Sequence, residues 1–121
     1  MHKAILTALL TAALSAPAFA ASYPVSGRWG ESTSSKPGSI DCSGKRVIDF
    51  NGTTRTDSGG SVRAFQNRSV IADGPSQYRI IDIFSNGQIS SGQLSYTLRQ
   101  VDDDHIVVAM PGATLRLQRC K

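Results

Sequence analysis

The chain has 121 residues, of which 40% are hydrophobic and 18% charged, and its formal net charge is +4. This length permits one domain. After residue 20 the sequence holds 15 Val and Ile against four Leu, three Lys and a single Glu, so residues that favour helix surfaces are nearly absent. The composition excludes a helical protein and argues against a large catalytic architecture.

The first twenty residues have the features of an export signal. Met1-His2-Lys3 is a positive start, residues 4–14 form an apolar run, and Ala18-Phe19-Ala20 is a small-x-small cleavage pattern. The apolar run is too short to persist as a membrane anchor, and no later stretch approaches about 18 apolar residues. We therefore predict cleavage after Ala20, one domain over residues 21–121, a periplasmic or secreted location and no stable membrane insertion.

Eight short strands are predicted beyond the signal. Their approximate bounds in chain order are 26–31, 45–50, 61–66, 68–72, 77–84, 92–101, 105–110 and 113–119. Turn signals such as Asn51-Gly52, Asn86-Gly87 and Pro111-Gly112 separate them, which is typical of a β-meander. We predict an all-β fold, a small antiparallel up-and-down β-barrel of about eight strands, with a β-sandwich as the alternative. Residues 31–41 are expected to form a mobile polar loop, and residues 51–60 a flexible tip.

Alternation along the strands predicts which side chains face the interior. The expected inward set is Leu94, Tyr96, Leu98, Ile106, Val108, Met110, Leu115 and Leu117. Gln118 is expected to face outward. Residues 80–84 are ambiguous, because Ile80 and Phe84 oppose Ile81 and Ile83. The Ile81–Ile83 face is either covered by a second layer or available as a contact surface.

The two cysteines, Cys42 and Cys120, predict a disulfide, since an even count in an exported chain indicates pairing. They enclose 77 residues, and closing such a loop contributes roughly 4–5 kcal/mol in the chain-entropy model. No Cys-x-x-Cys pair is present, which disfavours redox chemistry or a metal site.

The charged residues form no pattern that indicates catalysis or nucleic-acid binding. The nine arginines after residue 20 are dispersed, as on solvated faces, and form no basic stripe interleaved with aromatic residues. Asp102-Asp103-Asp104 before His105 is best explained as a charged hairpin tip, with weak cation binding as the alternative. Asp49 and Asp82 lie within predicted strands, each on the wet face or beside a strand arginine. We predict no catalytic, cofactor or metal residues, no enzyme activity and no nucleic-acid partner.

Gly27-Arg28-Trp29 opens the first predicted strand, and Arg119 lies on the last. This combination resembles the calycin superfamily, which includes lipocalins, avidins and small bacterial inhibitors of secreted metalloproteases. The resemblance implies that Trp29 closes one end of an up-and-down barrel and that Arg119 packs across it. A guanidinium over an indole is a favourable cation–π contact and would shield that end from water.

Three functions follow from these observations. The leading expectation is a non-catalytic binding protein of the bacterial cell envelope or medium, whose partner is an unknown small ligand or envelope protein. Any ligand would be small, or would sit at an open rim built from residues 51–60 and 86–92. The second is a protein inhibitor that uses the arm Ala21–Val25, as the resemblance to metalloprotease inhibitors implies. The third is a structural envelope protein without a pocket.

Overall fold

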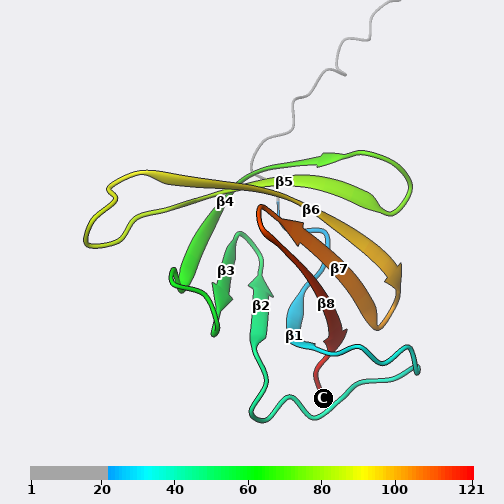
Figure 1. Cartoon of the computed structure of the whole chain (residues 1–121). Coiled ribbons are helices and arrows are strands. Elements are labelled where there is room, and N and C mark those ends of the chain that lie inside the picture. Colours follow the sequence, from blue (N-terminus) through cyan, green and yellow to red (C-terminus); the bar gives the residue numbers. More distant parts are fainter. Residues whose placement is uncertain (1–21) are drawn as a thin grey trace, which may run out of the picture.

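Eight β-strands follow one another around a closed barrel in the computed structural model, which describes residues 22–121 (Figure 1). The strands are β1 (Gly27–Glu31), β2 (Val47–Asn51), β3 (Thr54–Asp57), β4 (Ala64–Ala72), β5 (Gln77–Phe84), β6 (Gly92–Asp102), β7 (His105–Met110) and β8 (Ala113–Arg119). Each strand pairs antiparallel with its neighbours in the chain, and β1 pairs with β8. The predicted all-β up-and-down barrel is confirmed, and the sandwich is excluded.

The predicted export signal lies outside the described residues, as does Ala21. Within residues 22–121, we find no helix with the length and apolar character needed to cross a membrane.

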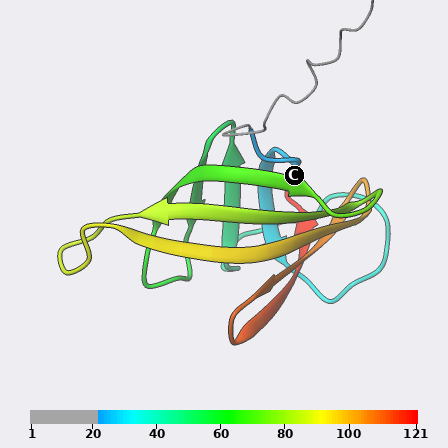
Figure 2. The same cartoon turned by 90° about the horizontal axis from the view of Figure 1, so that it is seen from above.

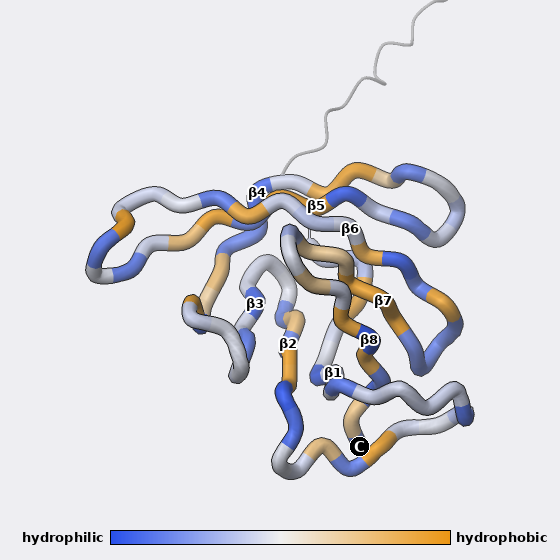
Figure 3. Tube along the Cα trace, in the orientation of Figure 1, coloured by the Kyte–Doolittle hydropathy of each residue, from blue (hydrophilic) through white to orange (hydrophobic). Residues whose placement is uncertain are grey.

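Side chains from all sides of the barrel meet in its interior. The predicted inward residues Tyr96, Leu98, Ile106, Val108 and Leu117 are each at most 4% exposed. Figure 3 shows hydrophobic colour concentrated in the strands, while the segment between β1 and β2 is mostly white to blue. Other residues of this core are Trp29, Ile48, Phe50, Ile80 and Leu115. Burial of such apolar side chains stabilises a fold by about 1.5–3 kcal/mol each, before the entropy cost of ordering the chain is subtracted.

Two strand predictions were wrong. The predicted number of eight strands is nevertheless correct, because one strand was missed and another was divided in two. Residues 54–57, expected in a flexible tip, form β3, in which Thr54 and Thr56 face outward. Arg55 pairs with the buried Asp82, and Asp57 pairs with the half-buried Arg46. Residues 64–72, expected as two strands, form the single strand β4. The predicted break at residue 67 is instead a β-bulge between Asn67 and Ser69 within the β4–β5 ladder.

The β5–β6 hairpin extends beyond its partners. The β4–β5 pairing ends at Gln66 and Ile83, whereas the β5–β6 pairing continues to Phe84 and Gly92. Figures 1 and 2 show the tip of this hairpin projecting from the barrel. We call residues 83–93 the β5–β6 arm. Because β4 does not pair with the arm beyond Ile83, the last residue of β5, Phe84, has no neighbouring strand on that side.

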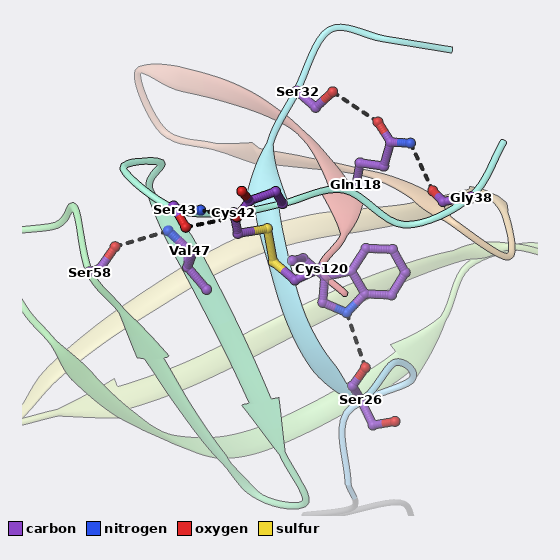
Figure 4. The surroundings of a disulfide bond; sticks show 11 residues. Ser26, Ser32, Gly38, Cys42, Ser43, Val47, Ser58, Gln118 and Cys120 are labelled. Atoms are coloured by element: carbon purple, nitrogen blue, oxygen red, sulfur yellow. Dashed lines mark hydrogen bonds between the residues drawn. A yellow bond between two sulfur atoms is a disulfide. The ribbon is translucent and has the colours of Figure 1, made fainter. Parts of the chain in front are cut away.

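The segment between β1 and β2 folds back along β8. Ile40 bridges to Cys120, and the amide of Gly38 donates to Asp104 Oδ2 at 2.9 Å. Gln118, predicted to face outward, is only 2% exposed because this segment covers it. Its side chain accepts a hydrogen bond from Ser32 Oγ and donates to the carbonyl of Gly38 (Figure 4). It also donates to the carbonyl of Lys36. The polar loop expected at 31–41 is therefore tied to the barrel by hydrogen bonds.

Candidate functional site

Trp29 and Arg119 lie together at one end of the barrel. Their backbones are paired in the β1–β8 ladder, and the guanidinium carbon of Arg119 lies 4.4 Å from the centre of the indole. Trp29 is fully buried and donates from Nε1 to the carbonyl of Ser26. Arg119 donates to the carbonyl of Asp103 at 2.8 and 3.2 Å. The contact therefore joins β1, β8 and the β6–β7 turn.

The predicted disulfide between Cys42 and Cys120 is confirmed, and the two Cα atoms are 5.6 Å apart (Figure 4). It joins the β1–β2 segment to the end of β8. Gly30 of β1 lies beneath it, and a Cβ at that position would come within 2.5 Å of Cys42 Sγ. A side chain at residue 30 would displace the bridge.

The segment before β1 packs against the same end. Tyr23 and Val25 are 7% and 8% exposed, and the amide of Tyr23 donates to the carbonyl of Gly52. The Tyr23 ring meets Phe50 edge to face at 5.1 Å. Residues 23–25 are thus part of the barrel's packing and do not project from it.

A polar cluster lies inside the barrel, where sequence reasoning placed none. Arg55 and Asp82 are 1% and 0% exposed, and Arg55 Nε donates to Asp82 Oδ2 at 2.8 Å. Asp82 also accepts from the hydroxyls of Tyr23 and Tyr96 at 2.9 and 2.8 Å. Asn67 Nδ2 is the fourth donor, at 3.2 Å. Of the two positions expected for Asp82, the structure shows the one beside a strand arginine.

Burial controls the titration of this cluster. Loss of water raises the pKa of both Tyr23 and Tyr96 far above the ordinary tyrosine value, and the nearby Asp82 carboxylate adds to the rise. Burial alone would lower the pKa of Arg55, but the hydrogen bond to the Asp82 carboxylate and the negative charge of that carboxylate hold the pKa above the usual range. Arg55 is therefore cationic and the two phenols are neutral at any physiological pH.

A hollow of about 560 Å³ lies where the β5–β6 arm diverges from the β3–β4 hairpin. Its apolar wall includes Phe65 and Phe84, whose rings meet edge to face at 5.5 Å. The polar lining comprises Thr54, Arg55, Thr56, Gln66, Arg68, Ser85, Ser90, Ser91 and Gln93. The two segments predicted to build a rim, 51–60 and 86–92, both contribute to this lining, through Thr54–Thr56 and Ser90–Gly92, and β4 adds residues that the prediction did not include.

A second hollow of similar volume is lined by Glu31, Lys45 and Arg116 together with neighbouring polar residues. All of these side chains are exposed or half-buried. The hollow beside the arm differs because the buried residues Arg55 and Phe65 contribute to its wall. Mixed polar and apolar walls around a concave space are the usual features of a small-molecule site.

The acidic residues before His105 form the β6–β7 hairpin turn. Asp102 Oδ1 lies 2.8 Å from His105 Nδ1 and accepts from the amide of Asp104. Both hydrogen bonds lower the pKa of Asp102, and the one with His105 has the larger effect. In residues 22–121, no group of three or more His, Cys, Asp or Glu side chains is placed to hold a metal ion.

The remaining candidates from the sequence lie on the outside of the barrel. Asp49 is half-buried on β2, between Arg28 of β1 and Thr56 of β3. Ile81 is half-buried, and Ile83 is 36% exposed. The structure therefore shows the outer face of β5 as partly open surface.

The site residues that sequence reasoning missed are Arg55, Phe65 and Phe84. The alternation Thr54-Arg55-Thr56-Asp57 was the available signal, because it places both charged residues on one face of a strand. Comparison with known proteins adds no assignment: no family model, curated protein or solved structure matches the chain.

Proposed function

We propose that this chain is a non-catalytic, exported binding protein of the bacterial cell envelope or medium, with a calycin-like barrel and a small ligand held in the hollow beside the β5–β6 arm. The observation that carries this proposal is the hollow of about 560 Å³, whose wall combines the aromatic residues Phe65 and Phe84 with hydroxyl groups and arginines. Its volume lies in the range of small-molecule sites.

The location rests on two features of the chain. Disulfides persist in oxidising compartments, and Cys42 is bonded to Cys120. Residues 1–20 carry the sequence features of an export signal. Together they favour the periplasm or the medium.

Two other functions receive less support. An inhibitor that inserts its N-terminal arm into a protease needs a projecting segment, but Tyr23 and Val25 are buried against the barrel. The third function, a structural protein without a pocket, does not explain a hollow whose wall includes the buried cation Arg55. The calycin-like assignment rests on the closed eight-stranded barrel and the Trp29–Arg119 contact.

Native mass spectrometry of the protein purified from its own host's envelope fraction tests the proposal. We expect a mass above that of the cleaved chain, which returns to the chain mass on denaturation. Ala64→Phe would fill the hollow, since Ala64 is an exposed residue of its lining, and should remove the extra mass. Ala113→Phe, on exposed β8 surface, is the matched control and should retain it.

Unliganded wild-type protein would overturn the proposal. A bound mass of protein size would favour an envelope-protein partner instead. Extra mass that survives Ala64→Phe would place the ligand elsewhere.

A further inference from the structure

Arg55 is held by only one of its three guanidinium nitrogens. Nε donates to Asp82, whereas Nη1 and Nη2 have no hydrogen-bond partner among residues 22–121. The residue is 1% exposed, so bulk water does not supply the missing acceptors. Buried donors left without acceptors are costly, so they are rare in native proteins and call for a specific explanation such as a bound water or ion, strain or a functional role.

Asp82 has no capacity left to satisfy these nitrogens. Its two oxygens accept from Tyr23, Tyr96, Asn67 and the Nε of Arg55. A carboxylate offers about four lone-pair positions, and all four are used. The Nη groups therefore require an acceptor from outside the cluster.

Two aromatic rings fix the plane of the guanidinium. Its carbon lies 4.0 Å from the centre of Phe65 and 5.0 Å from the centre of Tyr96. These cation–π contacts cover its faces, so the open hydrogen-bonding capacity lies along its edge. A planar carboxylate matches two parallel N–H groups on that edge in a bidentate pair.

The hollow beside the arm is suited to an anion. Arg55 and Arg68 both belong to its lining, and none of the described residues that line it is acidic. Thr56 and Ser90 add hydroxyl groups to the lining. The rings of Phe65 and Phe84 provide an apolar surface for the body of a ligand.

Access to the Nη edge requires a side-chain movement, because the Nη atoms are covered. Phe84 is half-buried, whereas Phe65 and Tyr96 are 8% and 4% exposed. Phe84 packs on Gly92 at the point where the arm leaves β4. Phe84 is therefore the least buried of these three rings, and its displacement is the movement by which a ligand would enter.

We propose that the hollow binds a small organic carboxylate with an apolar body, and that the Nη1 and Nη2 atoms of Arg55 recognise its carboxylate. This inference rests on the proposed function and names the chemical class of its ligand. Arg68 also lines the hollow but is exposed, so it is the other arginine that could attract a carboxylate and serves as the comparison for Arg55.

The test compares benzoate with its neutral analogue benzamide. Both have the same ring, and only benzoate carries the charge that Arg55 recognises. Titration of isotope-labelled wild-type protein, followed by NMR, should show benzoate binding at least about tenfold more tightly. Contacts between the benzoate ring protons and the ring of Phe65 should appear in the complex.

Two variants separate the buried cation from the rim cation. Arg55→Lys keeps the positive charge beside Asp82 but removes the two parallel N–H groups that bind a carboxylate. The preference for benzoate over benzamide should therefore fall about tenfold. Arg68→Gln should change it less than about threefold. If Arg55→Lys does not fold, the wild-type ratio and the Phe65 contacts decide the question.

Equal binding of the two compounds in the hollow would overturn the carboxylate inference and leave the proposed function intact. So would a preference that disappears in Arg68→Gln and survives in Arg55→Lys. Absence of binding by both compounds would also overturn the inference, while the native mass measurement tests the proposed function separately.

Discussion

Arg119 contributes to stability through its contact with Trp29. Replacement by Ala removes the guanidinium over the indole and its hydrogen bonds to Asp103, so we expect a loss of about 1–2 kcal/mol in the free energy of unfolding. Trp29 is the only tryptophan, and its emission should shift to the red as water reaches the ring. Denaturant unfolding and fluorescence measure both effects.

Arg99→Ala is the matched control, because Arg99 is exposed on the outer face of β6. Its cost should stay below about 0.5 kcal/mol. Small and equal effects of both variants, with unchanged Trp29 emission, would show that the contact does not stabilise the end of the barrel.

Asp82 compensates the charge of Arg55 inside the barrel. Asp82→Asn keeps the shape but leaves a buried cation without its counter-ion, so we expect a destabilisation of about 3–5 kcal/mol. Asp73→Asn provides the comparison, since its ion pair with Arg79 is exposed and should contribute less than about 0.5 kcal/mol. Chemical denaturation of the two variants checks the difference; near-equal losses would contradict a structural role for the buried pair.

Asp57 links stability to acid pH. Burial alone would raise its pKa, but hydrogen bonds from Arg46 at 2.7 and 2.9 Å and from the amide of Gly59 hold the pKa below the usual range. Because the folded state favours the ionised carboxylate, this stabilisation is complete above the unfolded pKa of about 4 and declines as the pH falls below it.

Asp57→Asn isolates that contribution. The gap in unfolding free energy between wild type and variant should be constant from about pH 7 to pH 5 and should narrow below about pH 4. Urea titrations across this range measure it. A gap that does not change with pH would show that ionisation of Asp57 adds no stability.

At the scale of elements, Gln118 holds the β1–β2 segment against β8. Gln118→Ala removes its hydrogen bonds to Ser32, Lys36 and Gly38, so we expect faster hydrogen exchange and faster proteolytic cleavage in residues 32–40. Gln88→Ala, in the exposed tip of the arm, should leave both rates unchanged. Unaltered exchange in residues 32–40 of the Gln118 variant would mean that the disulfide and Ile40 bridge hold the segment without Gln118.

Strand prediction succeeded where one face of a strand is uniformly apolar. In β6 and β8 the alternation of apolar with polar residues identifies the inward side chains from local sequence. In β3 the inward residues are Arg55 and Asp57, whose partners Asp82 and Arg46 are 27 and 11 residues away. In the sequence alone, a strand face with charged residues is read as solvent-exposed, because the partners that allow its burial lie elsewhere in the chain.

At the scale of the whole molecule, the disulfide closes a loop of most of the barrel. Its two cysteines are 78 positions apart, and the chain-entropy model assigns the bridge about 4.5 kcal/mol. Reduction, or replacement of both cysteines by serine, should lower the free energy of unfolding by roughly this amount. Thiol labelling of denatured, unreduced protein should detect no free cysteine; two labelled thiols per chain would contradict the bridge.

The sequence by itself determined the all-β class and the pairing of the two cysteines, which depend on composition, on a period of two along each strand and on an even cysteine count. It favoured a barrel over a sandwich without deciding between them, and the Trp29–Arg119 contact was implied by a family resemblance. Only the tertiary structure decided that Arg55 and Asp82 lie inside, that Gln118 is covered, and that a hollow forms beside the arm. These features depend on which distant segments of the chain meet. Local sequence does not distinguish a buried charged residue from an exposed one, because its burial depends on a counter-ion and on covering side chains from other segments.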